Sequence, residues 1–294
     1  MASMRDIKRR KNSIQSTQQI TKAMKLVSTV KLQRAKNAAE RSKVYFNSMY
    51  QTVSSILARS SNINHPYLNK AESEKKAIVV ITSNRGLAGG YNSNVTKLVT
   101  NNPEFKKEDV LIYAIGKKGK DTLARKGYTI AGDYAEEINA PLYQDAADIC
   151  KTLLTSFENG EIGEIYLAYT VFKNTVSQIP TMLKLLPVDL KEAEGVKDIE
   201  KDDNASEKQA IMNFEPAEDE ALNLIIPKYI TSLIYGAMVE AVASENGARM
   251  QAMDNATSNA EEMIDKLELS YNRARQGHIT QELTEIIGGA EALS

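Results

Sequence analysis

The spacing of apolar and small residues predicts a long helix at the start of the chain. Neither proline nor glycine occurs from Arg5 to Ser60, which over this length favours an uninterrupted helix. Apolar and small residues recur there at steps of three, four or seven, the repeat of a helix that pairs with another along one seam. At about 1.5 Å per residue, this helix would be about 80 Å long. The expected seam positions are Ile7, Ile14, Thr21, Ala35, Ala38, Ser42, Tyr45, Met49, Thr52 and Ile56.

The last third of the chain repeats this spacing and predicts a second long helix. We expect it to begin near Glu215, because Pro216 suits the first helical turn and the acidic residues that follow favour the helix dipole. Pro227 lies inside the apolar run LNLIIPKYITSLI, so we expect a break or kink there. Both seams should bury little apolar area, because many of their residues are alanine, serine or threonine. The expected seam positions are Met253, Ala256, Ala260, Met263, Leu267, Ser270, Ala274 and Gly277.

Strand and helix patterns alternate between these two helices. Alternation of this kind is typical of a mostly parallel sheet covered by helices. A compact domain commonly has its ends close together, so the two long helices should pair antiparallel. Amphipathic helices are expected over 117–127 and 142–157. A brief apolar stretch follows the first of these helices at 128–131. Strands are expected in KKAIVVITS, in VLIYAIG, and in EIYLAYTVF and VSQIPTMLKLLPV, the last two side by side.

The predicted fold class is therefore α/β plus long helices. An antiparallel coiled coil of N- and C-terminal helices would carry an inserted Rossmann-like or flavodoxin-like α/β domain. The expected boundaries give a first helix over 1–60, a central domain over 61–214, and a second helix over 215–294 that pairs with the first. The segment 191–209 is acidic and poor in large apolar residues, so we interpret it as a solvated loop.

Charge is distributed unevenly along the chain. The net charge of −1 argues against nucleic acid as a default partner, but ten basic residues face one acid between Arg5 and Lys36. The bias reverses between Asp189 and Glu220, with twelve acids against four lysines. The basic helix could bind a phosphate backbone or face the carboxylates of a partner protein. The basic start has no apolar core and no run of about 18 apolar residues occurs, so neither a secretory signal nor a membrane span is predicted.

The sequence offers little equipment for catalysis. The segment SNRGLAGGYN follows a predicted strand, but its glycines do not have the spacing of a phosphate-binding loop, and neither do those of GKKGKD. The two histidines, His65 and His278, lack metal-ligand spacing. The single cysteine, Cys150, excludes an internal disulfide, fits a reducing compartment and is interpreted as a small packing residue. We therefore predict no catalytic residue, no cofactor and no metal site.

Three stretches resemble the gamma subunit of F-type ATP synthases, and the resemblance extends over essentially the whole chain. The N-terminal helix of that family is matched by SIQSTQQITKAMKLVSTVKL, and its first strand and turn by ITSNRGLAGGYN. The most specific match is ITQELTEIIGGAEA, which has every fixed position of the family signature I-T-x-E-x-x-[DE]-x-x-x-G-A. These positions are Ile279, Thr280, Glu282, Glu285, Gly289 and Ala290.

The resemblance implies a central-stalk rotor subunit, present once per complex and not catalytic by itself. In this family the coiled coil passes along the axis of a ring of three alpha and three beta subunits, where the nucleotide chemistry takes place. The globular domain lies with the epsilon subunit on the c-ring in the membrane. The implied location is peripheral, at the cytoplasmic side of a bacterial plasma membrane. The sequence does not encode whether H⁺ or Na⁺ is the coupling ion.

The resemblance also assigns residues by position. Lys22, Met24 and Lys25 correspond to the region near an acidic loop of the beta subunits, which favours the acidic-partner interpretation of the basic helix. A polar cluster that contacts the catalytic subunits is assigned to Arg275, Gln276, Thr280, Glu282 and Glu285. An apolar bearing tip is assigned to Ile286, Ile287, Ala290 and Leu293, and the globular-domain turn to Arg85, Gly86, Gly89 and Gly90.

Two alternatives belong to other classes of protein. The chain could be a coiled-coil scaffold unrelated to nucleotide hydrolysis. It could also be a flavodoxin-like enzyme that binds a nucleotide at the SNRGLAGG turn. The first predicts no effect on ATP turnover, and the second predicts nucleotide binding by the isolated chain.

Overall fold

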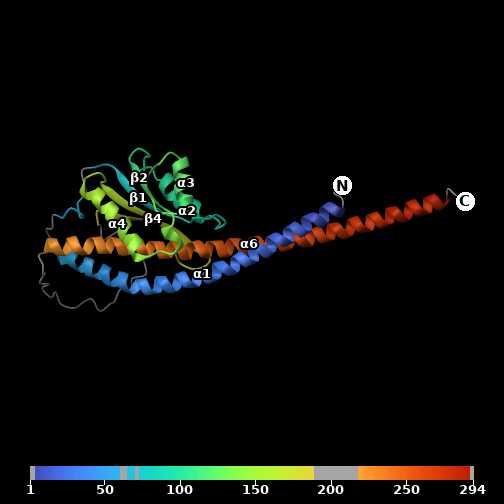
Figure 1. Cartoon of the computed structure of the whole chain (residues 1–294), viewed down its shortest axis with the longest axis horizontal. Coiled ribbons are helices and arrows are strands. Elements are labelled where there is room, and N and C mark those ends of the chain that lie inside the picture. Colours follow the sequence, from blue (N-terminus) through green and yellow to red (C-terminus); the bar gives the residue numbers. More distant parts are fainter. Residues whose placement is uncertain (1–3, 60–64, 70–72, 189–217, 292–294) are drawn as a thin grey trace. The chain divides into compact units, whose positions relative to one another are not determined.

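The computed structural model describes residues 4–59, 65–69, 73–188 and 218–291 and divides into two compact units. We call 30–248 the sheet unit, and 1–29 together with 249–294 the helical unit; two long helices run through both (Figure 1). The elements are α1 Met4–Arg59, β1 Lys76–Ile81, α2 Tyr91–Thr100, β2 Val110–Ile115, α3 Lys117–Arg125, β3 Thr129–Asp133, the 3-10 helix η1 Glu137–Asn139, α4 Tyr143–Glu158, β4 Glu164–Phe172, β5 Gln178–Leu186 and α6 Glu218–Glu291.

The sheet confirms the predicted α/β class. Its strand order is β3-β2-β1-β4-β5, and every neighbouring pair is parallel except β4 and β5. That antiparallel pair confirms that the last two predicted strands lie side by side. The expected strand-to-helix turn after β1 leads into α2. The predicted acidic loop at 191–209 and the predicted helix start near Glu215 lie outside the described residues.

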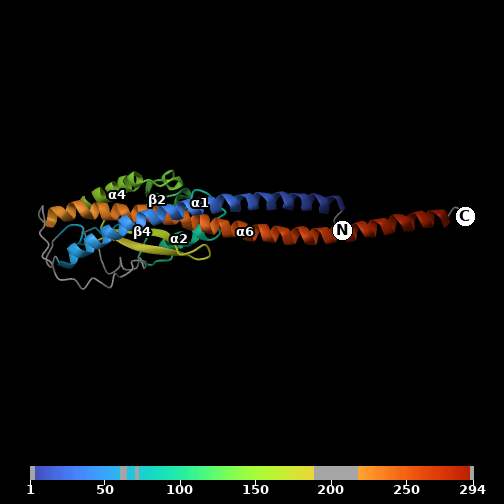
Figure 2. The ribbon, with the colours of Figure 1, turned by 90° about the horizontal axis from the view of Figure 1, so that it is seen from below.

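Both faces of the sheet are covered. Ala77, Val79 and Ile81 of β1 pack on one side with α4 and the first part of α6, whereas Ile78 and Val80 pack on the other side with α2 and α3. Figure 2 shows α4 and α2 on opposite sides of the sheet. A strand buried on both faces needs an apolar residue at every position, which explains why this segment shows no polar alternation.

In the sheet unit, α1 does not follow its predicted seam throughout. Thr52 is exposed and the next residue, Val53, is fully buried in its place. Val53 and the half-buried Met49 pack on the sheet unit's core, so this part of α1 presents a face suited to a sheet and its helices. Among the other predicted positions here, Ala35 is buried, Ala38 is half-buried, Tyr45 is exposed, and the side chains of Ser42 and Ile56 lie outside the described part.

Helix α6 continues through Pro227, so the predicted break at that residue is wrong. Proline removes one backbone hydrogen bond from a helix interior and crowds the preceding turn. Here Ile226 and Ile230 on either side of it are buried in the core, and the backbone oxygen of Pro227 accepts a hydrogen bond from Thr231 Oγ1 at 2.8 Å. Tertiary packing therefore keeps this part of the chain helical through a residue that disfavours a helix interior.

The same helix corrects the expectation about apolar runs. Within Ala221–Ala290 an 18-residue stretch reaches a mean hydropathy of 1.3, enough in length and composition to cross a membrane. In the structure, 61% of that stretch is buried inside the protein. Its composition follows from packing against the sheet unit's core, as in the core helix of a soluble protein.

Candidate functional site

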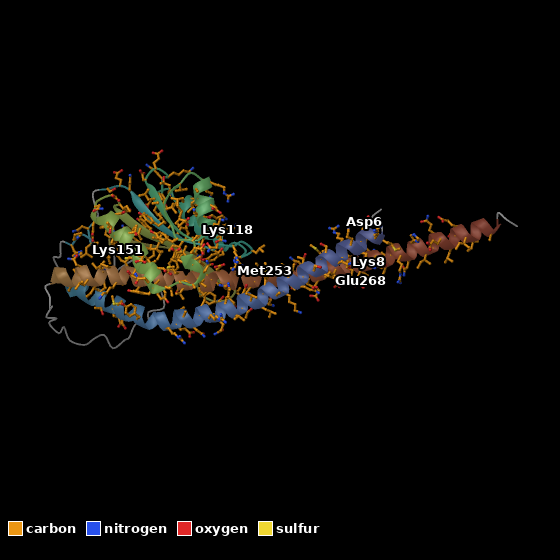
Figure 3. The ribbon with its side chains drawn as sticks, viewed as in Figure 1. Asp6, Lys8, Lys118, Lys151, Met253 and Glu268 are labelled. Atoms are coloured by element: carbon orange, nitrogen blue, oxygen red, sulfur yellow. The ribbon has the colours of Figure 1, made fainter. Side chains whose placement is uncertain are left out.

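In the helical unit, α1 and α6 pair antiparallel. The residue numbers of each cross-helix pair add up to 278 or 279, so pairing runs in opposite directions with one constant register. Figure 3 shows the first turns of α1, marked by Asp6 and Lys8, alongside the stretch of α6 that contains Glu268. The pairs are Thr21 Oγ1 with Thr257 Oγ1 at 2.8 Å, Lys25 Nζ with Asp254 Oδ1 at 2.6 Å, and Lys11 Nζ with Glu268 Oε2 at 3.2 Å.

The α6 seam has a different phase from the one predicted. Met253 and Ala260 are buried as expected, but Met263 is 52% exposed and Ile264 turns inward in its place. The contact of Thr257 with the buried Thr21 accounts for the shift, because a seam through Thr257 continues by steps of three and four to Ile264. Farther along, Leu267, Tyr271 and Ala274 are half-buried, whereas the predicted Ser270 and Gly277 are exposed.

On α1 the predicted seam is present and more complete than expected. Ile7 and Ile14 are half-buried and Thr21 is buried. The sequence pattern predicted no seam position between Thr21 and Ala35. In the structure, Ser28 and Leu32 are buried in that stretch. The seam thus contains several small or polar side chains, which bring the helices together without burying much apolar area.

The end of α6 extends beyond the described part of α1. The register places Met4, the first described residue of α1, level with Ala274 or Arg275. From Arg275 to Ala290 every residue is exposed in this chain. Arg275–Glu291 is therefore a stretch of about 25 Å of helix without a described α1 residue beside it.

The structure places the predicted contact residues in two separate groups. On α1, Lys22 is exposed and Met24 half-buried, and Lys25 is bound to Asp254 of its own chain. On α6, Thr280 donates to the backbone oxygen of Gln276 at 2.9 Å. The remaining polar residues of that group make contacts one turn apart along α6: His278 Nδ1 lies 3.2 Å from Glu282 Oε1, and Gln281 donates to Glu285 at 2.9 Å.

The predicted bearing tip is an exposed apolar surface. Ile286 is 67% exposed and Ile287 is 59% exposed, and Ala290 is exposed as well. Leu283 and Ile279, one and two turns earlier, are also exposed and enlarge this surface. Leu293 lies outside the described residues. Exposed apolar groups gathered in this way are typical of surfaces that bind another protein.

The turn after β1 is closed by the chain's own side chains. A phosphate-binding turn needs free backbone N–H groups that point at the ligand. Here one amide of the turn donates to a side chain, and two amides at the start of α3 donate to side chains at the end of β1 and in the turn, at 2.8–2.9 Å. The donors and acceptors are Ser83 N–H to Asn92 Oδ1, Lys117 N–H to Asn84 Oδ1, and Gly119 N–H to Thr82 Oγ1.

The glycines of that turn serve its backbone shape. Gly89 has a φ of 55°, and its neighbour Leu87, although not a glycine, has a φ of 65°. Gly90 immediately precedes α2, and a Cβ at Gly90 would lie 3.2 Å from Asn94 Nδ2. Space around Gly86 is open. This turn therefore fits a tight connection between strand and helix better than a nucleotide site.

Cys150 is buried, and its Sγ lies 3.6 Å from the backbone oxygen of Pro227. Burial raises the pKa of this thiol to about 11, so only about one molecule in a thousand would carry a thiolate at pH 8. We expect no reaction of the folded chain with a thiol-specific dye such as Ellman's reagent at pH 8, and one equivalent once urea unfolds it. Rapid labelling of the folded chain would contradict the burial.

Comparisons with known proteins decide the family. The family model described as ATP synthase matches residues 3–293. The ATP synthase gamma chain of Lachnoclostridium phytofermentans is 65% identical over 294 residues, covering all of both chains. The chain belongs to the ATP synthase gamma chain family. The sodium ion specific gamma chain of Acetobacterium woodii is 41% identical and covers 99% of both chains.

A solved structure supports the fold of this gamma chain family member. A chain of the Euglena gracilis mitochondrial ATP synthase, OSCP/F1/c-ring, aligns with a TM-score of 0.66 at 21% identity, covering 99% of this chain and 94% of that one. Members of the gamma chain family are non-catalytic subunits of the ATPase complex, so the scaffold and enzyme alternatives are not favoured. In the described residues, no group of three or more His, Cys, Asp or Glu side chains could hold a metal ion.

Sequence reasoning missed the acidic partners that this gamma chain supplies to itself. Asp254 and Glu268 pair with lysines of α1, yet the sequence pattern led us to look for carboxylates only on another subunit. The antiparallel register was the missing information. With paired numbers adding up to about 279, the basic stretch 5–36 faces 243–274, which contains both acids.

Proposed function

We propose that this chain is the central-stalk rotor of an ATP synthase and mechanically couples ion flow across a membrane to ATP synthesis or hydrolysis. The observation that carries the proposal is the match over the whole chain to gamma chains, at 65% identity to one of them. One copy would work with three alpha and three beta subunits, an epsilon subunit and a c-ring. In this proposal the antiparallel helices of the helical unit form the shaft, and the sheet unit is the globular domain of the rotor.

The surface of the shaft is uneven, and this unevenness is the basis of the mechanism. On α1 the side chains of Ile20, Leu26 and Val27 are exposed and apolar, whereas Lys22 lies exposed among them. A shaft with a different profile in each direction favours a different conformation in each of three otherwise equal catalytic subunits. Turning the shaft exchanges those preferences, and nucleotide occupancy in turn biases the angle of the shaft.

Residues Lys22, Met24 and Lys25 are proposed to contact the beta subunits. The ammonium group of Lys22 is exposed and suits a carboxylate of an acidic loop. Lys25 already has a carboxylate partner in Asp254, and both side chains are partly exposed. Lys25 would therefore exchange or share that partner as the shaft turns. A partly exposed ion pair is weak enough for such an exchange, at about 0–1 kcal/mol.

The end of α6 is proposed to be the part that turns inside the top of the ring. Arg275, Gln276, Thr280, Glu282 and Glu285 supply exposed polar groups to loops of the catalytic subunits. The apolar tip beyond them slides in an apolar sleeve, because it offers few groups that would form a strong contact at one angle only. Because the contacts are weak and distributed, no single angle of the shaft is so favourable that rotation stops there.

As a subunit of ATP synthase, the chain associates with the membrane through the complex. We place it at the cytoplasmic side of a bacterial plasma membrane. The similarity to gamma chains of Lachnoclostridium phytofermentans and Acetobacterium woodii supports this location.

Reconstitution tests the proposal. Purified alpha and beta subunits are mixed with the full chain, with a chain lacking 280–294, or with no chain, and ATP hydrolysis is measured. We expect the full chain to raise turnover on the order of ten-fold, the range of a typical coupling between sites, and the shortened chain to raise it less. Turnover that is the same with and without the chain would exclude a rotor and favour a scaffold.

A further inference from the structure

The β4–β5 hairpin ends in a turn that is held tightly by its own side chains. Asn174 Oδ1 accepts hydrogen bonds from the amides of Val176 and Ser177 at 2.9 and 2.7 Å. The amide of Asn174 donates to the backbone oxygen of Ser177 at 3.1 Å, and Gln178 Nε2 donates to that of Thr175 at 2.9 Å. Such bonds fix an Asx-type turn. The hairpin therefore presents its flanking residues in a defined geometry.

One side of this hairpin packs closely on α6. Ser244 Oγ donates to the backbone oxygen of Thr170 at 2.9 Å, and both residues are buried. At Gly247 a Cβ would lie 3.2 Å from Phe172 Cε2 and 3.5 Å from Gln178 Nε2. Glycine in a helix interior costs about 1 kcal/mol relative to alanine. Its presence here fits the close approach of the Phe172 ring.

The same aromatic ring also contacts α1. Lys36 Nζ lies 5.0 Å from the centre of the Phe172 ring, within the range of a cation–π interaction. Phe172 thus contacts both long helices from the end of a strand that is paired along its whole length.

These contacts lie near both places where the chain passes between the two units. Lys36 follows Thr29 by two turns, and Gly247 precedes Arg249 by two residues. Among the α1 side chains that the structure describes, Met49 and Val53 pack on the core, about three and a half turns or more beyond Lys36. By contrast, α6 is buried in that core over more than five turns, from Leu222 to Ala241. Leu32 and Ala35 of α1 are buried close to Lys36. The hairpin therefore adds a contact with both helices at the place where each enters or leaves the sheet unit.

We propose that the β4–β5 hairpin makes the sheet unit, α1 and α6 turn as one body, with Phe172 as the residue that positions α1 against α6. This inference rests on the proposed rotor function. Force applied to the sheet unit reaches α6 through its large buried face. It reaches the beginning of the sheet-unit part of α1 through Phe172, so loss of that contact lets α1 lag and lets rotation slip without work.

The test uses the complete enzyme in inverted membrane vesicles. We measure ATP hydrolysis and the membrane potential generated per ATP hydrolysed, which does not require knowing whether H⁺ or Na⁺ is moved. The variants are Phe172→Ala, which removes the ring, Gly247→Leu, which displaces it, and the double variant, in which the leucine fills the space of the ring. Gly236→Ala is the matched control, because a Cβ at this glycine of α6 meets no atom within 4 Å.

We expect each single variant to lower the potential per ATP about three-fold while hydrolysis changes by less than about two-fold, and the double variant to recover most of the loss, as coupled residues do. The control should behave like the parent. Hydrogen exchange of the amides of Thr175–Ser177 shows whether the contact has been lost. If it has and the potential per ATP is unchanged, or if the double variant recovers nothing, the hairpin is not the coupling element. Failure of the rotor function itself would appear differently, as hydrolysis that does not depend on the chain at all.

Discussion

Replacing Gly116 by alanine should lower the free energy of unfolding by at least about 3 kcal/mol. Gly116 directly follows β2 and has a φ of 105°, which L side chains rarely adopt. A Cβ there would lie 2.0 Å from the backbone oxygen of Thr82 at the end of β1. Because the obstructing atom belongs to the backbone directly after β1, the ends of β1 and β2 would have to separate. Urea unfolding followed by circular dichroism measures the change.

A matched substitution separates this effect from the general effect of replacing a turn glycine. Gly86 lies in the turn after β1, where a Cβ would meet no atom within 4 Å, and no positive φ is recorded there. Gly86→Ala should stay within about 0.5 kcal/mol of the parent. If the two variants proved equally stable, the close approach of β1 and β2 at Gly116 would be wrong.

Replacing Glu164 by glutamine should lower the free energy of unfolding by about 3 kcal/mol at neutral pH, as expected when one member of a buried ion pair is removed. Glu164 is only 8% exposed and lies between two lysines. Its Oε1 is 3.1 Å from Lys184 Nζ and its Oε2 is 3.4 Å from Lys76 Nζ, and Tyr166 donates a hydrogen bond to it at 3.1 Å. The variant leaves both ammonium groups, themselves largely buried, without their counter-charge.

The pH dependence provides a second signature of the same carboxylate. Burial alone would raise the pKa of Glu164, but the hydrogen bonds from Lys184 and Tyr166 and the nearby charges outweigh it and lower the pKa below its usual value. A carboxyl whose pKa is lower in the folded chain stabilises it above the unfolded pKa, about 4.3, and loses that contribution as the pH falls through the folded value. The stability gap between parent and Glu164→Gln should therefore be constant near neutral pH and shrink as the pH falls below the unfolded pKa, about 4.3. A gap that stayed constant would mean that the charge of Glu164 is not what stabilises the fold.

The helices and most strands of this protein could be predicted because they depend on local patterns. The long helices were predicted from their periodic spacing and the strands from their apolar runs. Neither prediction required knowing which elements pack together. The phase of the α6 seam beyond Ala260 did require that knowledge: Ala256 is half-buried as predicted, but so is Thr257, which contacts Thr21 of α1, and from there the seam runs to Ile264 instead of Met263. The same holds for Val53, which packs on a core built from distant parts of the chain.

The candidate site depended on resemblance more than on physical pattern. Along the end of α6 the polar residues Thr280, Glu282 and Glu285 resemble an ordinary solvated helix face, because they contact residues one turn away in the same helix. Their contacts with other subunits stay a prediction. Conversely, the resemblance did not indicate that Lys25 pairs with Asp254 of its own chain. Predicting that pair required the register between the two helices.

The apolar stretch of α6 has a consequence for biosynthesis. All five strands precede α6 in the chain, so they leave the ribosome before it does. The sheet and α4 have time to fold first. The apolar stretch of α6 then leaves the ribosome next to the apolar surface on which it packs, and not into bulk solvent or a lipid bilayer. A rearranged gene that placed this helix first would expose its nascent apolar face to chaperones and to the membrane-insertion machinery for the whole time that the strands are made.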